Sequence, residues 1–120
     1  MRIFSIALIL IFFGCFPSGT TENKFLQNVR DGNTAIVRAL LERNRISNLN
    51  AADSTASTAL MIASERGYTE IVKLLLAHGA STVPTNIQGK SAFDLARESG
   101  HIQIIELLEH TSTTRKKGDS

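Results

Sequence analysis

Apolar residues recur at helical spacing in the second half of the chain, and polar residues separate them. Two such stripes have the same internal spacing and lie 33 positions apart: Ile71, Val72, Leu74 and Leu75, and Ile104, Ile105, Leu107 and Leu108. This spacing predicts two helices, each with one apolar face. A single short helix cannot cover its own stripe, so neighbouring units are expected to pack against one another.

Capping residues mark where these helical units begin and end. Thr58 and Ser91 precede helical segments and can accept hydrogen bonds from the first turn, as N-caps do. Gly67 and Gly100 follow the same segments and suit the left-handed end of a helix. Long loops are expected at 45–57 and 80–90. The six predicted helices are Asn23–Arg30, Thr34–Arg43, Thr58–Arg66, Thr69–His78, Ser91–Ser99 and His101–His110.

The same segment is repeated along the chain. The sequence TALMIA at 58–63 recurs as SAFDLA at 91–96, and Gly67 pairs with Gly100 at the same offset. A third copy lies upstream at an offset of 35, with Gly32 opposite Gly67 and Asn44 opposite Gly79. Asn is the residue that best replaces Gly at a left-handed helix end, which supports this alignment.

This unit resembles the ankyrin repeat, from its TALMIA opening at 58–63 to its Gly79-Ala80 ending, and the resemblance covers 24–110. Ala59 and Ala92 replace the proline of the family's opening motif, Met61 and Asp94 replace its histidine, and the first copy lacks the motif. The resemblance implies an all-α solenoid of about three stacked helix-turn-helix units. The domain is expected at 20–110, with repeats at about 23–53, 54–86 and 87–112. Residues 111–120 are polar and are expected to be a disordered tail.

Residues 1–19 read as a signal peptide. Arg2 gives a positive start, and the apolar run from Ile3 to Phe13 is too short to span a bilayer. Phe12-Phe13-Gly14-Cys15 resembles a bacterial lipobox, so Cys15 is a lipidation candidate; alternatively, Cys15 is removed with the signal. We therefore expect an exported bacterial protein, either periplasmic or a membrane-anchored lipoprotein, or alternatively secreted. Membrane contact is expected only through the signal or lipid anchor.

Charge and composition argue against other functions. The net charge is +2, and charges of both signs alternate, so no nucleic-acid face is predicted. The single cysteine excludes an intramolecular disulfide and a Cys-rich metal site. We predict no metal site and no cofactor, and structural roles for His78, His101 and His110. Catalytic motifs are absent, and Asp94 and Glu98 are interpreted as a helix cap and a solvated face, so no enzyme is expected.

By resemblance, ankyrin proteins bind their partners along a concave face of loop tips and first helices. The candidate partner-binding residues at the loop tips are Ser54, Thr55, Ser57, Ile87, Gln88 and Lys90. Those on the first helices are Arg30, Asp31, Glu65, Arg66, Glu98 and Ser99. We predict a monomer that binds one or more proteins in the cell envelope without catalysis. The alternative is a secreted effector or immunity-type inhibitor that occludes a target protein.

Overall fold

The computed structural model describes residues 21–119, and within that range it holds six helices and no β-strand. The helices are α2 (Thr21–Arg30), α3 (Thr34–Glu42), α4 (Ala59–Arg66), α5 (Thr69–Ala77), α6 (Ala92–Ser99) and α7 (Ile102–Asp119). The all-α fold is confirmed. The predicted signal peptide and Cys15 lie outside the described residues, so both remain predictions.

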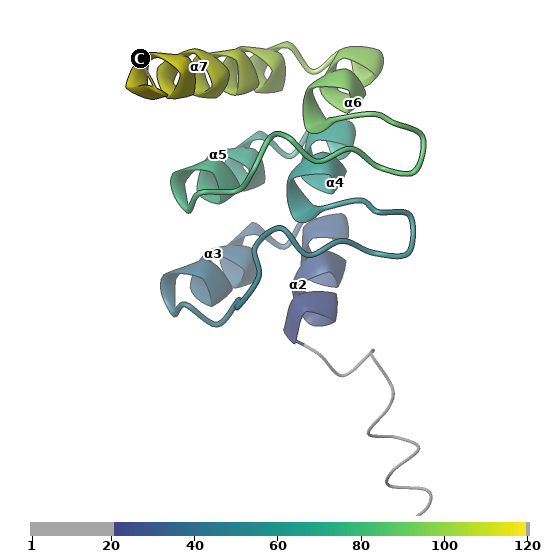
Figure 1. Cartoon of the computed structure of the whole chain (residues 1–120). Helices are drawn as coiled ribbons and strands as arrows, with labels where there is room; N and C mark the ends of the chain where they lie inside the picture. Colours follow the sequence, from purple (N-terminus) through teal and green to yellow (C-terminus); the bar gives the residue numbers. More distant parts are fainter. Residues whose placement is uncertain (1–20, 120) are drawn as a thin grey trace, which may run out of the picture.

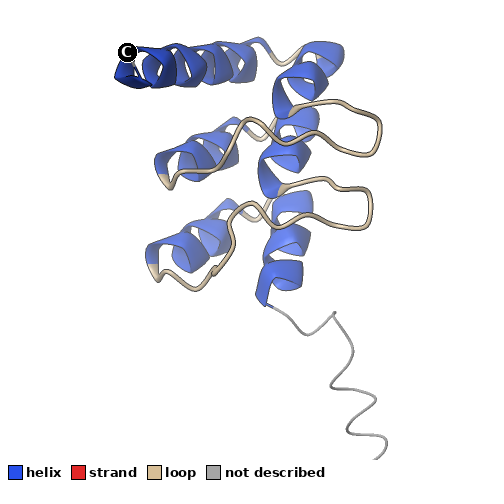
Figure 2. Cartoon of the chain, in the orientation of Figure 1, coloured by secondary structure: helices blue, strands red, loops and turns tan. Residues whose placement is uncertain are grey.

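The helices form three pairs that stack in two columns (Figure 1). One column holds α2, α4 and α6, and the other holds α3, α5 and α7, with each helix packed on the next in its column. Two long loops, one after α3 and one after α5, project beside the first column (Figure 2). The predicted solenoid of three stacked helix pairs is therefore confirmed.

Local signals set where the first helices of the second and third pairs begin and end. The Thr58 hydroxyl oxygen accepts a hydrogen bond from the Met61 backbone N–H at 3.4 Å. Ser91 and Asp94 form a capping box, in which each side chain accepts from the other residue's backbone N–H, at 3.2 and 3.0 Å. Gly67 and Gly100 end these helices with φ angles of 79° and 76°. The predicted caps and stops are confirmed at all four positions.

The apolar stripes of the second helices lie between neighbouring pairs. Leu75 of α5 is 0% exposed and Leu108 of α7 is 2% exposed, and α5 packs on both α3 and α7. Each fully buried leucine contributes about 1.5–3 kcal/mol relative to an exposed one. Burial of these leucines by the adjacent helix pair therefore supplies much of the stability that an isolated helix pair would lack.

Tyr68 and His101 join successive pairs at their turns. The Tyr68 hydroxyl donates to the Arg30 carbonyl at 3.3 Å, and a His101 ring nitrogen lies 3.1 Å from the Glu65 carbonyl. Each ring covers the left-handed glycine of the preceding pair, Gly32 or Gly67. These contacts fix the spacing between pairs, and they give His101 the structural role that the sequence predicts.

The C-terminal end of the chain differs from the prediction. A disordered tail was expected from residue 111, but α7 continues as a helix to Asp119. The tail is polar, yet no proline interrupts it and its first glycine is Gly118. The Thr111 hydroxyl also donates to the Leu107 carbonyl at 2.9 Å within the helix. Polar composition alone therefore did not stop the helix, whereas the other predicted ends agree within two residues.

Candidate interaction surface

The two long loops end in tight turns of the same construction. The Asp53 carboxylate accepts the backbone N–H groups of Thr55 and Ser57 at 2.8 and 3.0 Å. In the next repeat the Asn86 side chain accepts those of Gln88 and Lys90 at 2.9 and 3.0 Å. In each turn a short polar side chain thus holds its own backbone in a fixed shape. The predicted tip residues are therefore presented on ordered turns.

A backbone hydrogen bond joins the two tips to each other. The Ile87 N–H donates to the Thr55 carbonyl at 3.0 Å, although the two residues lie in different repeats. Ser54, Thr55 and Gln88 are exposed around this contact, and the Ile87 side chain is 72% exposed. The tips consequently form one continuous edge, and Ile87 is its largest accessible apolar side chain.

The first helices place three charged residues at the same repeat position beside this edge. Arg30, Glu65 and Glu98 occupy corresponding places in α2, α4 and α6. Arg30 forms an ion pair with Asp53, and Glu98 forms one with Lys90 at 2.9 Å. Among the described residues, Glu65 forms no ion pair. The structure therefore brings Arg30 and Glu98 into contact with the loops, whereas the Glu65 carboxylate faces solvent.

Asp53 organises the first loop tip, and the sequence analysis did not single it out. Its burial alone would raise its pKa, but hydrogen bonds from Thr55, Ser57 and Arg30 outweigh this, so the pKa of Asp53 is lowered. The carboxylate thus stays ionised while it holds one tip and links that tip to α2. The matching Asn86, 33 positions on, was the available sequence signal.

The remaining candidates differ in how accessible they are. Ser57 and Lys90 are half-buried within the turns, and Arg30 is half-buried by its ion pair. Asp31, Arg66 and Ser99 are exposed at the ends of the first helices. The accessible part of the predicted surface is therefore the joined tips together with the exposed residues at the ends of the first helices, among them Glu65 and Arg66 of the central repeat.

The two acidic residues near the start and end of α6 both have partners in the structure. Hydrogen bonds from the backbone and hydroxyl of Ser91 hold the pKa of Asp94 below its usual range, so it is an ionised cap. Glu98 is engaged by Lys90. Within residues 21–119, no group of three His, Cys, Asp or Glu side chains is arranged to hold a metal ion. The helices of this same range are too short or too polar to cross a bilayer.

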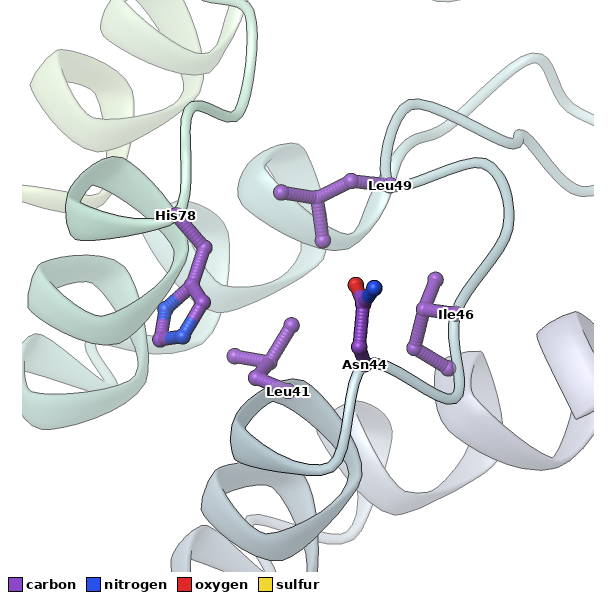
Figure 3. Close-up of a pocket in the computed structure, with 5 residues that line it drawn as sticks. All are labelled: Leu41, Asn44, Ile46, Leu49 and His78. Atoms are coloured by element: carbon purple, nitrogen blue, oxygen red, sulfur yellow. The ribbon is translucent and has the colours of Figure 1, made fainter.

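A small hollow lies away from the tips, where α3 and α5 end (Figure 3). Leu41, Asn44, Ile46, Leu49 and His78 line it, and its volume is about 80 Å³. Ligand sites usually need about 300 Å³ or more. The His78 Nδ1 atom also lies 2.9 Å from the Leu74 carbonyl oxygen, so this side chain is hydrogen-bonded to the last turn of its own helix. The hollow is therefore a packing feature and not a ligand site.

Comparison with known proteins finds a family model over most of the described stack, and relatives over parts of the chain. The family model described as Ankyrin repeats (3 copies) matches residues 25–117. The probable E3 ubiquitin-protein ligase XBOS34 of Oryza sativa subsp. japonica is 38% identical over 74 residues, which cover 62% of this chain. The Notch-regulated ankyrin repeat-containing protein of Xenopus laevis is 36% identical over 90 residues, or 73% of this chain. The potassium channel AKT2/3 of Arabidopsis thaliana is 34% identical over 82 residues, or 68% of this chain.

These relatives differ greatly in how much of their own length is matched. The chain spans 14% of the rice ligase and 10% of the potassium channel, but 79% of the Notch-regulated protein. What the similarity covers is thus the repeat region, which such different proteins share. The three relatives come from plants and animals, so the bacterial origin expected from the leader finds no support in them.

Proposed function

Because the chain belongs to the ankyrin-repeat family, we propose that it binds a partner protein along the face formed by its joined loop tips and first helices. Ankyrin repeats generally mediate protein–protein interaction and are generally non-catalytic. The proposed contact surface, called the concave face below, comprises Ser54, Thr55, Glu65, Arg66, Ile87 and Gln88.

The hydrogen bond from Ile87 to Thr55 is the observation that carries this proposal. It orders two tips before any partner arrives, so binding loses less conformational entropy than it would with loose loops. Ile87 supplies an apolar anchor at the edge, while Glu65 and Arg66 supply one charge of each sign beside it. A partner that matches this surface needs an apolar pocket for Ile87, flanked by one positively and one negatively charged group.

Affinity capture with the full chain as bait tests the concave face. We expect Ile87→Lys, and the charge swap Glu65→Lys with Arg66→Glu, to remove partners that the wild-type chain retains. Ile102→Lys is the matched control, because Ile102 is 64% exposed and lies on α7, outside this face. If every captured protein also binds both concave-face variants, the proposed surface is wrong.

We also propose that the chain acts after export, anchored in the cell envelope or released, on the strength of its apolar leader. The support is the run from Ile3 to Phe13 with Cys15 shortly after it. Intact-mass spectrometry of the chain expressed from Met1 is the test. We expect a mature product that begins at a lipidated Cys15 or downstream of it, whereas an unprocessed 13.1 kDa chain would contradict export.

A further inference from the structure

The outer flank of α3 exposes apolar residues at positions that the other two repeats bury. Ile36 corresponds to Ile71 and Ile104, which are both 0% exposed, yet Ile36 itself is 48% exposed. Leu40 corresponds to Leu75 and Leu108 and is only half-buried. In the second and third repeats the second helix of the preceding pair packs at this side. The first repeat therefore presents a helix-binding face with no helix from residues 21–119 on it.

The neighbouring helix α2 does not share this apolar flank. Its Lys24 and Gln27 are exposed, and they correspond to Ala59 and Ile62, which α4 buries. Polar residues at such places are what the terminal repeat of a solenoid needs to face water. A further complete repeat would have to bury these polar side chains. The open side of the first pair is thus polar on α2 and apolar on α3. It can therefore bury one additional helix against α3, but not a complete helix pair.

The last repeat gives the contrast. Met61 of α4 is buried, while the corresponding residue of α6 is Asp94; the buried Ser64 likewise corresponds to the exposed Arg97. The open flank of α6 therefore carries charge at positions that the central repeat keeps buried. In the first column both open flanks, on α2 and on α6, are therefore polar, and the apolar groove belongs to α3 of the second column.

Two arginines determine what kind of helix would fit. The groove on this flank, of about 480 Å³, is lined by Ala35, Ile36, Ala39, Leu40, Arg43 and Arg45, and we call it the α3 flank. Within the described chain neither arginine forms an ion pair, and Glu42 of the same helix is not among the lining residues. The α3 flank is thus an apolar strip with two arginines and no carboxylate among its lining residues.

This charge disfavours two occupants from the chain itself. A symmetric contact between two copies would pair this flank with itself, and none of its lining residues is a carboxylate that could meet the arginines. The leader is apolar, but its sole charged residue is Arg2, so it has no carboxylate to offer. Charge complementarity favours a helix with acidic residues.

We propose that the α3 flank is a second docking site, distinct from the concave face, for one amphipathic helix of a partner protein. That helix presents apolar side chains at i and i+4 to Ile36 and Leu40, and carboxylates to Arg43 and Arg45. It lies on α3 in the way that α3 lies on α5. Such a site lets the protein hold one partner on the concave face and a helical segment on the opposite column.

A stapled helical peptide with leucines at i and i+4 and flanking glutamates is the probe. Its binding to the full chain is followed by fluorescence anisotropy. We expect saturable binding that Ile36→Lys weakens at least about tenfold, because the buried isoleucine drives the contact. Ile102→Lys is the matched control and should bind as the wild type does. The absence of saturable binding, or equal binding by Ile36→Lys, would overturn the proposal.

A charge swap separates this site from nonspecific apolar binding. Arg43→Glu with Arg45→Glu should reject the glutamate peptide and accept a lysine version, and binding indifferent to this swap contradicts the proposal. Two results would assign the flank to another occupant and likewise overturn it. If the peptide binds only after Phe12→Lys with Phe13→Lys, the leader occupies the flank. If sedimentation shows a dimer that Ile36→Lys dissociates, a second copy of the chain occupies it. The Ile87→Lys variant should bind the peptide normally, so failure of the concave-face proposal leaves this result unaffected.

Discussion

At the scale of single residues, the two loop tips show how one turn is built from different side chains. Ala56 has a φ of 61°, and the corresponding Gly89 has a φ of 77°. A left-handed conformation suits glycine but costs an alanine roughly 1–2 kcal/mol. The turn tolerates this cost at Ala56 because Asp53 fixes the backbone on both sides of it. The first tip is therefore ordered but strained, whereas the second is ordered and relaxed.

Replacing Ala56 with glycine should relieve that strain. We expect Ala56→Gly to raise the free energy of unfolding by about 0.5–1 kcal/mol, because the relief exceeds the entropy that glycine adds to the unfolded chain. Gly89→Ala is the mirror control and should lower it by a similar amount, since no atom lies within 4 Å of its added Cβ. Urea denaturation followed by circular dichroism measures both. A loss of stability in Ala56→Gly, or a gain in Gly89→Ala, would contradict the role of the left-handed conformation at these positions.

Asp53 should make stability depend on pH. Its folded pKa is lowered, so its contribution is present above the unfolded pKa of about 3.9 and is lost as the pH falls through the folded value. Asp53→Asn keeps the turn in the form that Asn86 shows but removes the charge facing Arg30. We expect this variant to lose about 1 kcal/mol at pH 7 and progressively less as the pH falls below about 3.9. Urea titrations at pH 7 and at acidic pH test it, and a difference independent of pH would count against the ion pair.

At the scale of elements, the turns between paired helices serve a second purpose as contact points for the next pair. Gly67 ends α4, and the His101 ring of the following pair lies directly over it. Gly32 and Tyr68 repeat the arrangement one pair earlier. A side chain at either glycine would push the neighbouring pair away. Helix termination and the spacing between pairs therefore depend on the same residues.

Gly67→Ala should consequently cost more than the same change at Gly100. An added Cβ at Gly67 would lie 2.6 Å from the His101 ring, whereas at Gly100 nothing lies within 4 Å. Both variants incur left-handed strain of about 1 kcal/mol, and we expect Gly67→Ala to lose roughly a further 1–2 kcal/mol through the clash. Chemical denaturation gives the comparison. Equal losses would show that His101 moves aside freely.

At the scale of the whole described structure, stability and the proposed binding surfaces both follow from the stacking of the three pairs in residues 21–119. The central pair is covered on both sides, and its α5 contributes three of the fully buried side chains of the second column, Ile71, Val72 and Leu75. Each terminal pair has one open side, and the two columns differ there. In the first column polar or charged residues lie on the open side at both ends, on α2 and on α6, whereas α3 of the second column keeps an apolar strip. This asymmetry between the columns is a property of the stack and not of any one repeat.

Truncating a central core residue should destabilise the stack as a unit. Leu75 is 0% exposed between α3 and α7. We expect Leu75→Ala to lower the free energy of unfolding by about 2–5 kcal/mol, the range for a buried leucine that leaves a cavity. Ile102→Ala, at a side chain that is 64% exposed, should change it by less than about 0.5 kcal/mol. A small effect at Leu75 in urea denaturation would mean that neighbouring pairs do not support each other.

The sequence by itself determined the helices, their caps and the repeat. Thr58, Gly67, Ser91 and Gly100 act on backbone groups a few residues away, and the apolar stripes follow the helical period. Such signals are local, so they can be read from the chain. The tail shows the limit of this approach, because polar composition predicted disorder where α7 continues to Asp119.

Only the tertiary structure decided which candidate residues are available to a partner. The Ile87 to Thr55 hydrogen bond and the Arg30 to Asp53 ion pair join residues more than 20 positions apart. The exposure of Ile36 likewise depends on the absence, within residues 21–119, of a helix covering α3. Repeat position alone would bury Ile36, as it buries Ile71 and Ile104. Burial is set by what each repeat packs against, and a sequence pattern repeated in every unit cannot show which unit lies at an end.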